Sequence, residues 1–154
     1  MRLEHSIRIP AAQDDVWTFL MDVRAVARCM PGVGSVEPLG EDRYRGTLGV
    51  KIGPVQLSLQ GDVSFTERDQ AAGTARMSAD AKDARLGGGL RATVLMRLLA
   101  TAERETELAL TTDTQLLGRL GELGQPIIRR KADHLMERFA ENLRAAIGAG
   151  GAGG

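Results

Sequence analysis

The sequence has one cysteine, few aromatic side chains and no excess of charge of either sign. Cys29 has no partner among the 154 residues, so no disulfide can form within the chain, which fits a reducing cytoplasm. Lys and Arg number 20, as do Asp and Glu, and this balance argues against a nucleic-acid partner. No run approaches the roughly 18 apolar residues of a membrane span, and the charged first five residues do not begin a secretory signal. We therefore expect one cytoplasmic domain.

Alternation of apolar and polar side chains predicts an antiparallel sheet over most of the chain. The first strand, 3–9, ends at Pro10, and the cleanest alternation lies between Val55 and Phe65. Further strands are expected over 33–39, 43–52, 75–82, 90–98 and 108–112. Small residues such as Ala79 and Ala92 on the inward face would leave room inside the sheet.

Helical spacing of apolar residues predicts two short helices, 11–22 and 24–29, and one long helix, 116–147. Met30-Pro31-Gly32 ends the second helix. Glycines and Pro126 interrupt the first part of the long helix, so we expect loose first turns there, a hinge. Gly87-Gly88-Gly89 is expected to be a loop. We expect a domain that spans 1–147 and a flexible tail over the Gly/Ala segment 148–154. We also expect that the natural chain could continue beyond this tail to a membrane anchor.

Three motifs in order resemble the carbon monoxide dehydrogenase G-subunit family of the SRPBCC (START/Bet v 1-like) superfamily. They read Cys29-Met30-Pro31-Gly32, Lys51-Ile52-Gly53-Pro54 and Phe139-Ala140-Glu141-Asn142-Leu143. The resemblance implies an α+β helix-grip fold, in which a curved antiparallel sheet of six to seven strands wraps round a long C-terminal helix, with two short helices.

The resemblance also implies a function. Family members accompany molybdenum-containing carbon monoxide dehydrogenases, recruit that enzyme to the membrane and hand it a lipophilic quinone. We therefore expect a non-catalytic carrier for menaquinone or ubiquinone, with a molybdenum hydroxylase as partner and peripheral contact with the inner face of the cell membrane. No covalent cofactor, catalytic residue or metal site is expected.

The expected site is an apolar cavity between sheet and long helix. Its predicted lining is Trp17, Leu48, Val50, Leu57, Leu59, Met77, Val94, Met96, Leu110, Leu120 and Ile127. His5, on the inward face of the first strand, could donate a hydrogen bond to a quinone carbonyl. Such pockets are mostly apolar with a few placed polar groups.

The expected entrance is formed by Gly53, Pro54 and the glycines 87–89. Near it, Arg119 and the run Arg129-Arg130-Lys131 could contact anionic lipid headgroups or an acidic partner, although a solvated helix face is the simpler interpretation.

Two alternatives remain open from the sequence. One is a superfamily enzyme, a cyclase or hydrolase, which requires at least two ionisable groups in the cavity, for which the sequence offers His5 and Tyr44. The other is a protein-recruiting module with a filled core.

Overall fold

Seven strands, three α-helices and one short 3-10 helix form the structure, a computed structural model that describes residues 1–152. In chain order they are β1 (Arg2–Ile9), α1 (Gln13–Leu20), α2 (Val23–Cys29), β2 (Val33–Gly40), β3 (Arg43–Ile52), β4 (Val55–Asp69), β5 (Thr74–Asp83), β6 (Gly88–Ala102), β7 (Glu105–Gly118), η1 (Arg119–Leu123) and α3 (Gln125–Ala152).

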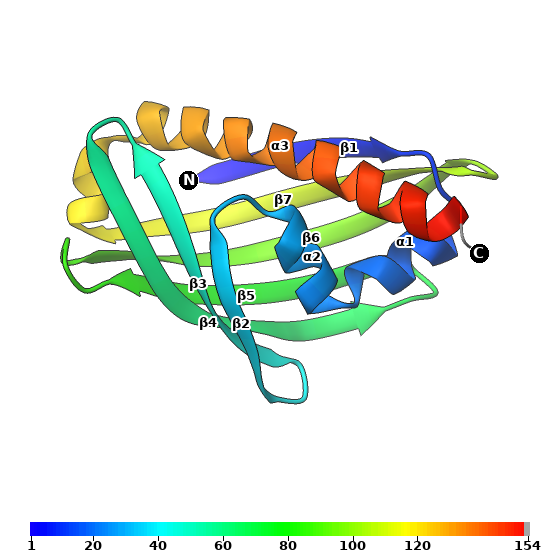
Figure 1. Cartoon of the computed structure of the whole chain (residues 1–154), viewed down its shortest axis with the longest axis horizontal. Coiled ribbons are helices and arrows are strands. Elements are labelled where there is room, and N and C mark those ends of the chain that lie inside the picture. Colours follow the sequence, from blue (N-terminus) through cyan, green and yellow to red (C-terminus); the bar gives the residue numbers. More distant parts are fainter. Residues whose placement is uncertain (153–154) are drawn as a thin grey trace.

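The strands form one antiparallel sheet in the order β1-β7-β6-β5-β4-β3-β2. From β2 to β7 each strand pairs with its neighbour in sequence, and β1 adds to the free edge of β7. The sheet curls beneath α3, which runs along β1, while α1 and α2 lie below the C-terminal half of α3 (Figure 1). The expected helix-grip arrangement is confirmed.

Period-two alternation decides which face of the sheet is buried. In β4, Leu57, Leu59 and Phe65 are buried, whereas Gln56 and Ser58 are exposed. Burial of apolar side chains contributes about 25 cal/mol per Å² removed from water, so this face turns inward under α3. The opposite face carries the charged and hydroxyl side chains.

The break after α2 depends on a glycine. Asp22 caps the start of α2 by accepting a hydrogen bond from the backbone N–H of Ala25 at 3.2 Å. After α2, Gly32 has φ +91°, and its carbonyl oxygen accepts a hydrogen bond from the N–H of Gly49 at 2.8 Å. A side chain at Gly32 would collide with the Gly49 carbonyl. Gly32 therefore lets the chain turn closely against β3 before β2 begins.

A large hydrophobic cluster fills the end of the sheet covered by α1, α2 and the C-terminal half of α3. Its fully enclosed members include Ile9, Val16 and Leu143, each with 0% exposure. The large cluster comprises Ile7, Ile9, Val16, Trp17, Leu20, Cys29, Phe65, Ala75, Met96, Leu98, Leu108, Phe139, Ala140, Leu143 and Ile147.

The long helix begins at Gln125, so the expected start at Leu116 is wrong. Leu116 pairs with Leu90 in the sheet, and β7 continues to Gly118, where φ is +58°. A separate 3-10 helix, η1, then precedes α3. The spacing of the leucines between 116 and 123 resembled that of a helix, because the end of β7 and the following η1 both direct leucines toward the same interior.

The expected loop of three glycines is also wrong in part. Gly88 and Gly89 lie in β6, where they pair with Gly118 and Leu117, and only Gly87 belongs to the turn. A Cβ on Gly88 would lie 2.7 Å from the backbone nitrogen of Leu120. The glycine therefore permits η1 to pack directly on β6.

Helix α3 continues through part of the Gly/Ala segment, to Ala152. The expected flexible tail thus lies partly in this helix, while 153–154 lie outside the described residues.

Candidate functional site

A second, smaller hydrophobic cluster lies at the end of the sheet where α3 begins. We call it the mouth cluster. Its buried members are Val50, Leu57 and Leu120, which come from β3, β4 and η1. Partly buried side chains around them are Leu48, Ile52, Val55, Leu86, Leu90, Leu116, Leu123, Ile128 and Leu135.

Between the two clusters lies a band of inward-facing side chains that packs against neither. We call Val63, Ala79, Ala81, Ala92 and Val94 the central band; each is half-buried, and none belongs to either cluster. Their partial exposure means that α3 and the two clusters leave part of this apolar surface uncovered. The central band is the candidate ligand site.

The register of the sheet explains why this band has room. Val63, Ala79, Ala92 and Thr114 are successive cross-strand partners on β4, β5, β6 and β7. Side chains of this size extend little from the sheet, so α3 cannot pack closely against all of them. The band is therefore an apolar floor with one hydroxyl at its β7 end.

The predicted lining residues divide between the clusters and the band. Trp17 and Met96 are buried in the large cluster, and Met77 and Leu110 are half-buried against it. Val50, Leu57 and Leu120 are buried in the mouth cluster, with Leu48 beside them. Leu59 is 5% exposed, and Val94 lies in the central band. A single cavity that all of them contact stays a prediction.

Ile127 does not face the interior. Its side chain is 46% exposed, because α3 begins at Gln125 with Ile128 and Leu135 turned inward against the mouth cluster. Successive residues on a helix point about 100° apart, so Ile127 projects outward. Its expected role in lining the cavity is therefore wrong.

His5 reaches from β1 to α3, where it meets a carboxylate that sequence reasoning missed. Its Nε2 lies 2.8 Å from Oδ1 of Asp133, and the imidazole is 14% exposed. Its Nδ1 is buried and has no hydrogen-bond partner among the described residues. The two residues lie 128 positions apart, so no local pattern could reveal the pair.

A buried carboxylate holds the turn beside the mouth cluster. Asp83 is 3% exposed, and its Oδ1 accepts hydrogen bonds from the N–H groups of Arg85 and Leu86, each at 2.9 Å. Its Oδ2 accepts one from the N–H of Ser58 at 2.7 Å. The bonds from Leu86 and Ser58 hold the pKa of Asp83 below its ordinary value, against the opposing effect of desolvation. Asp83 thus fixes Leu86 in place at the expected entrance.

The remaining entrance residues lie nearby. Gly53 and Pro54 form the exposed β3–β4 turn, with φ +59° at Gly53, and Ile52 and Val55 on either side pack in the mouth cluster. Gly87 lies in the turn that Asp83 holds. Whether these residues open to admit a ligand stays a prediction.

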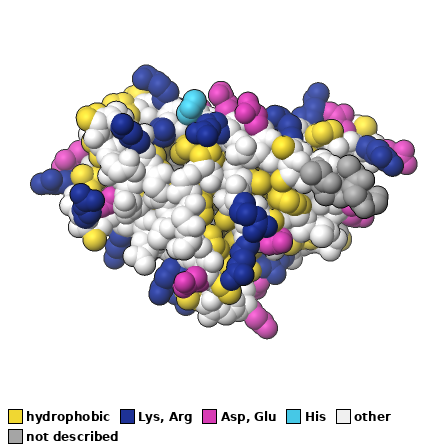
Figure 2. Space-filling view, viewed as in Figure 1, with side chains coloured by type: hydrophobic (Ala, Val, Ile, Leu, Met, Phe, Trp, Pro, Cys, Tyr) yellow, Lys and Arg dark blue, Asp and Glu magenta, His cyan; other side chains and the backbone are white. Residues whose placement is uncertain are grey.

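Two cations lie near the outward-facing Ile127, Arg130 exposed and Lys131 half-buried. Arg130 and Lys131 follow it by three and four residues, so all three share one face of α3. Arg129 points elsewhere and donates a hydrogen bond to the carbonyl of Arg2 at 3.1 Å. Arg119 lies exposed on η1, just before α3. Figure 2 shows Lys and Arg side chains next to hydrophobic ones over the start of α3.

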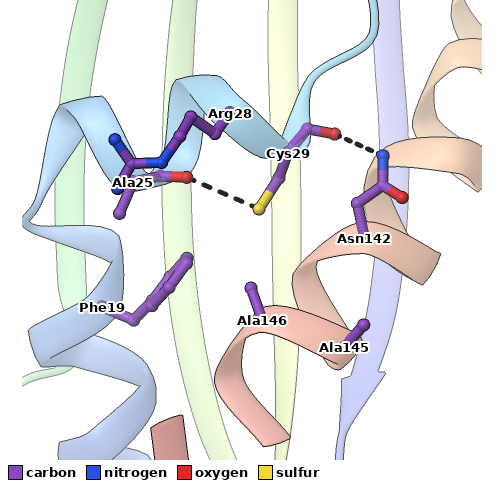
Figure 3. A pocket seen from close by; sticks show the side chains of 7 residues that line it. All are labelled: Phe19, Ala25, Arg28, Cys29, Asn142, Ala145 and Ala146. Atoms are coloured by element: carbon purple, nitrogen blue, oxygen red, sulfur yellow. Dashed lines mark hydrogen bonds between the residues drawn. The ribbon is translucent and has the colours of Figure 1, made fainter. Parts of the chain in front are cut away.

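A pocket of about 450 Å³ lies outside the interior, between α2 and α3. Figure 3 shows Phe19, Arg28 and Cys29 facing Ala146 across it. Asn142 crosses the gap and donates a hydrogen bond to the Cys29 carbonyl at 2.9 Å. Burial raises the pKa of the Cys29 thiol, and the neighbouring Arg28 opposes this. The thiol is therefore a weak nucleophile at neutral pH.

A pocket of about 820 Å³ lies on the outer face of the sheet, where charged and hydroxyl side chains such as Asp80, Arg91 and Thr93 line it. At this pocket a guanidinium nitrogen of Arg43 and one of Arg45 each lie 3.0 Å from a carboxylate oxygen of Asp62, so the arginines neutralise the Asp62 charge. No group of three or more potential metal ligands was found within residues 1–152. Among the helices so described, none combines the length and hydropathy that crossing a membrane requires.

The family model of the carbon monoxide dehydrogenase G subunit (CoxG) matches residues 6–148. The chain belongs to this family. No curated protein matches it. A conserved protein from Geobacillus kaustophilus superimposes on this CoxG family member with a TM-score of 0.88 at 21% identity, over 97% of this chain and 96% of the other.

Other solved structures share the fold of this CoxG family member. A START superfamily protein from Mycobacterium smegmatis has a TM-score of 0.72 at 11% identity and covers 96% of this chain and 97% of its own. The Zhui aromatase/cyclase from a Streptomyces species has a TM-score of 0.59 at 20% identity, over 96% and 90%. These structures are each under 25% identical to this chain, so they establish the shared fold alone.

Proposed function

We propose that the chain is a non-catalytic carrier that binds a lipophilic quinone, of the menaquinone or ubiquinone type, for a molybdenum-containing carbon monoxide dehydrogenase or a related hydroxylase. The central band supports this most directly. An apolar floor of Val63, Ala79, Ala92 and Val94 between two packed clusters suits a flat apolar ring, which gains about 25 cal/mol per Å² of buried apolar surface. Membership of the CoxG family supports the choice of partner.

The face around Ile127 supports peripheral contact with the inner leaflet of the cell membrane. An exposed apolar side chain could insert among lipids while Arg130 and Lys131 meet anionic headgroups, each worth about 1 kcal/mol near such a surface. The next residue, Ile128, belongs to the mouth cluster. Membrane contact and ligand entry would then occur at the same end of the molecule.

Ligand extraction tests the proposal. The purified protein is delipidated, incubated with vesicles that contain menaquinone or ubiquinone, re-isolated, and analysed by mass spectrometry. We expect about one quinone per chain. Ala79→Phe fills the band and should abolish uptake, whereas Ser78→Phe places the same ring on the outer face and should retain it. A protein that takes up no quinone would refute the carrier.

The enzyme alternative has one observation in its favour, the contact between His5 and Asp133 at 2.8 Å. Such a pair could act as a general base if a substrate approached the free nitrogen. A cyclase or hydrolase would convert a different hydrophobic substrate, and the same extraction would then recover no quinone from the protein.

A further inference from the structure

Three elements that supply the mouth cluster each carry an exposed cation directly before a cluster residue. These pairs are Lys51-Ile52 at the end of β3, Arg85-Leu86 in the β5–β6 turn and Arg119-Leu120 on η1. The exposed Arg130 follows Ile128, another member of the cluster, by two positions on α3. Because the cluster holds these four elements together, their cations lie around its edge. We call Lys51, Arg85, Arg119 and Arg130 the rim.

The rim cations have no carboxylate partner within the described residues. The ion pairs between side chains of residues 1–152 all use other cations. Asp83, which is close to Arg85 in sequence, is 3% exposed, and its two oxygens accept hydrogen bonds from three backbone N–H groups. The positive charge of the rim is therefore not neutralised by ion pairs.

The mouth end carries an excess of positive charge although the chain as a whole has none. Lys and Arg number 20 in the sequence, as do Asp and Glu. The segments at the mouth, 51–56, 82–87 and 119–131, together contain seven Lys or Arg and two Asp or Glu. Such a local excess attracts an anionic surface within about one Debye length, roughly 8–10 Å at ordinary salt.

The opposite end of the molecule has no such excess. Helix α1 and the β4–β5 and β6–β7 turns lie there, far from η1 and the start of α3 (Figure 1). The corresponding segments, 13–22, 67–73 and 101–107, contain two Lys or Arg and eight Asp or Glu. Ion pairs with arginines of neighbouring strands compensate Glu67 and Glu105. An anionic surface would therefore attract the mouth end and not the opposite end.

Apolar side chains project from the mouth end among the cations. Ile127 is 46% exposed, and Pro54 and Pro126 are exposed in the β3–β4 turn and the first turn of α3. An acidic protein surface would satisfy the cations but would not explain the exposed apolar residues. The boundary between the headgroups and acyl chains of an anionic bilayer accommodates both kinds of side chain.

We propose that the rim docks the protein with its mouth against an anionic bilayer, so that the quinone passes directly between the acyl chains and the interior. This inference rests on the proposed carrier function and adds the route that the ligand takes. The rim extends the membrane contact from the α3 face around Ile127 to β3, the β5–β6 turn and η1. A direct route spares the isoprenoid chain an exposure to water, which costs about 25 cal/mol per Å² of apolar surface.

The rate of quinone uptake from vesicles distinguishes direct transfer from passage through water. Delipidated protein, in excess, is mixed with phosphatidylcholine vesicles that contain a short-chain menaquinone and either no phosphatidylglycerol or about one third of it. At timed intervals the salt is raised to about 1 M, where the Debye length is about 3 Å and docked protein is released. The vesicles are then sedimented, and mass spectrometry measures the quinone that stays with the protein.

Direct transfer predicts a rate constant that increases with protein concentration, because each transfer requires a docked molecule. We expect phosphatidylglycerol to raise this rate constant at least tenfold at low salt, since several cations act together. Passage through water predicts a rate constant that depends only on how fast the quinone leaves the vesicle, whatever the protein concentration.

Two double variants with the same change in net charge separate docking from ligand binding. Arg85→Glu with Arg119→Glu reverses two rim charges and should lower the rate from phosphatidylglycerol vesicles at least tenfold. Arg97→Glu with Arg104→Glu reverses two exposed arginines of β6 and the β6–β7 turn and should leave that rate unchanged. Both variants should take up the natural amount of quinone from neutral detergent micelles, a measurement that requires a folded protein and no anionic surface.

The outcomes distinguish this inference from the function beneath it. A rate constant that does not change with protein concentration, or that phosphatidylglycerol does not raise, would overturn the direct route and leave the carrier intact. Equal rates for the two double variants would overturn the rim as the docking surface. Failure of the natural chain to take up quinone from micelles and from vesicles would overturn the carrier and the inference together.

Discussion

The carboxylate of Asp83 accepts a hydrogen bond from the backbone N–H of Ser58 at 2.7 Å and so joins the end of β5 to β4. Because the pKa of Asp83 is lowered in the folded protein, the ionised form stabilises the fold above the ordinary value of about 3.9. That contribution is lost as the pH falls through the lowered pKa. We expect the urea midpoint to drop below about pH 4, and Asp83→Asn to unfold more easily at pH 7 with a weaker acid dependence.

The control for this prediction is Asp80→Asn on the same strand. Asp80 is exposed and meets Arg91 at 3.4 Å on the outer face, where an ion pair contributes about 0–1 kcal/mol. Urea unfolding of both variants, followed by Trp17 fluorescence between about pH 3 and 7, checks the difference. An Asp83→Asn protein with the acid dependence of the natural chain would contradict the assigned role.

Much of the sheet could be predicted because its signal is local. In β4, each residue between Val55 and Phe65 occupies the face that alternation assigns to it, since one face of the sheet packs in the interior and the other faces solvent. The approximate positions of α1 and α2 follow from the same reasoning applied at helical spacing. The positions of these strands and helices can thus be predicted from the local sequence, without knowing which distant segments pack on them.

The errors lie where packing between distant segments decides the outcome. Leu116 continues a strand because β6 offers Leu90 as its partner, and Ile127 faces outward because η1 sets where α3 begins. Asp133 could not be linked with His5, since their contact depends on how α3 lies across β1. The candidate site was thus predictable as an apolar interior, while its polar contact was not.

Leu120 anchors η1 over the mouth cluster, so its truncation should loosen the entrance. The side chain is 3% exposed and packs with Val50 and Leu57. We expect Leu120→Ala to lower the free energy of unfolding by about 2–5 kcal/mol and to accelerate release of a bound naphthoquinone. Stopped-flow fluorescence measures the release, and Glu122→Ala, an exposed change on the same short helix, should affect neither quantity. Release at an unchanged rate from the Leu120 variant would place the entrance elsewhere.

The cationic face around Ile127 should bind anionic membranes. Reversal of charge in Arg130→Glu with Lys131→Glu removes two attractions of about 1 kcal/mol each and adds repulsion, so we expect at least a tenfold loss of affinity. Co-sedimentation with vesicles that contain phosphatidylglycerol measures it. Arg104→Glu changes an exposed arginine at the β6–β7 turn, far from the start of α3 (Figure 1), and serves as the matched control. If both proteins bind alike, this face is not the membrane contact.

Asn142 closes the gap between α2 and α3 by donating to the carbonyl of Cys29, and its loss should expose the thiol. In the natural chain we expect alkylation of Cys29 at pH 7 to be much slower than that of free cysteine, because burial raises the pKa of the thiol. Asn142→Ala should lower the free energy of unfolding by about 1 kcal/mol and raise the alkylation rate severalfold. Glu141→Ala, an exposed neighbour on α3, should leave the rate unchanged. Mass spectrometry of iodoacetamide-treated protein follows the reaction. Equal alkylation rates in both variants would show that the Asn142 hydrogen bond does not restrict access to Cys29 between α2 and α3.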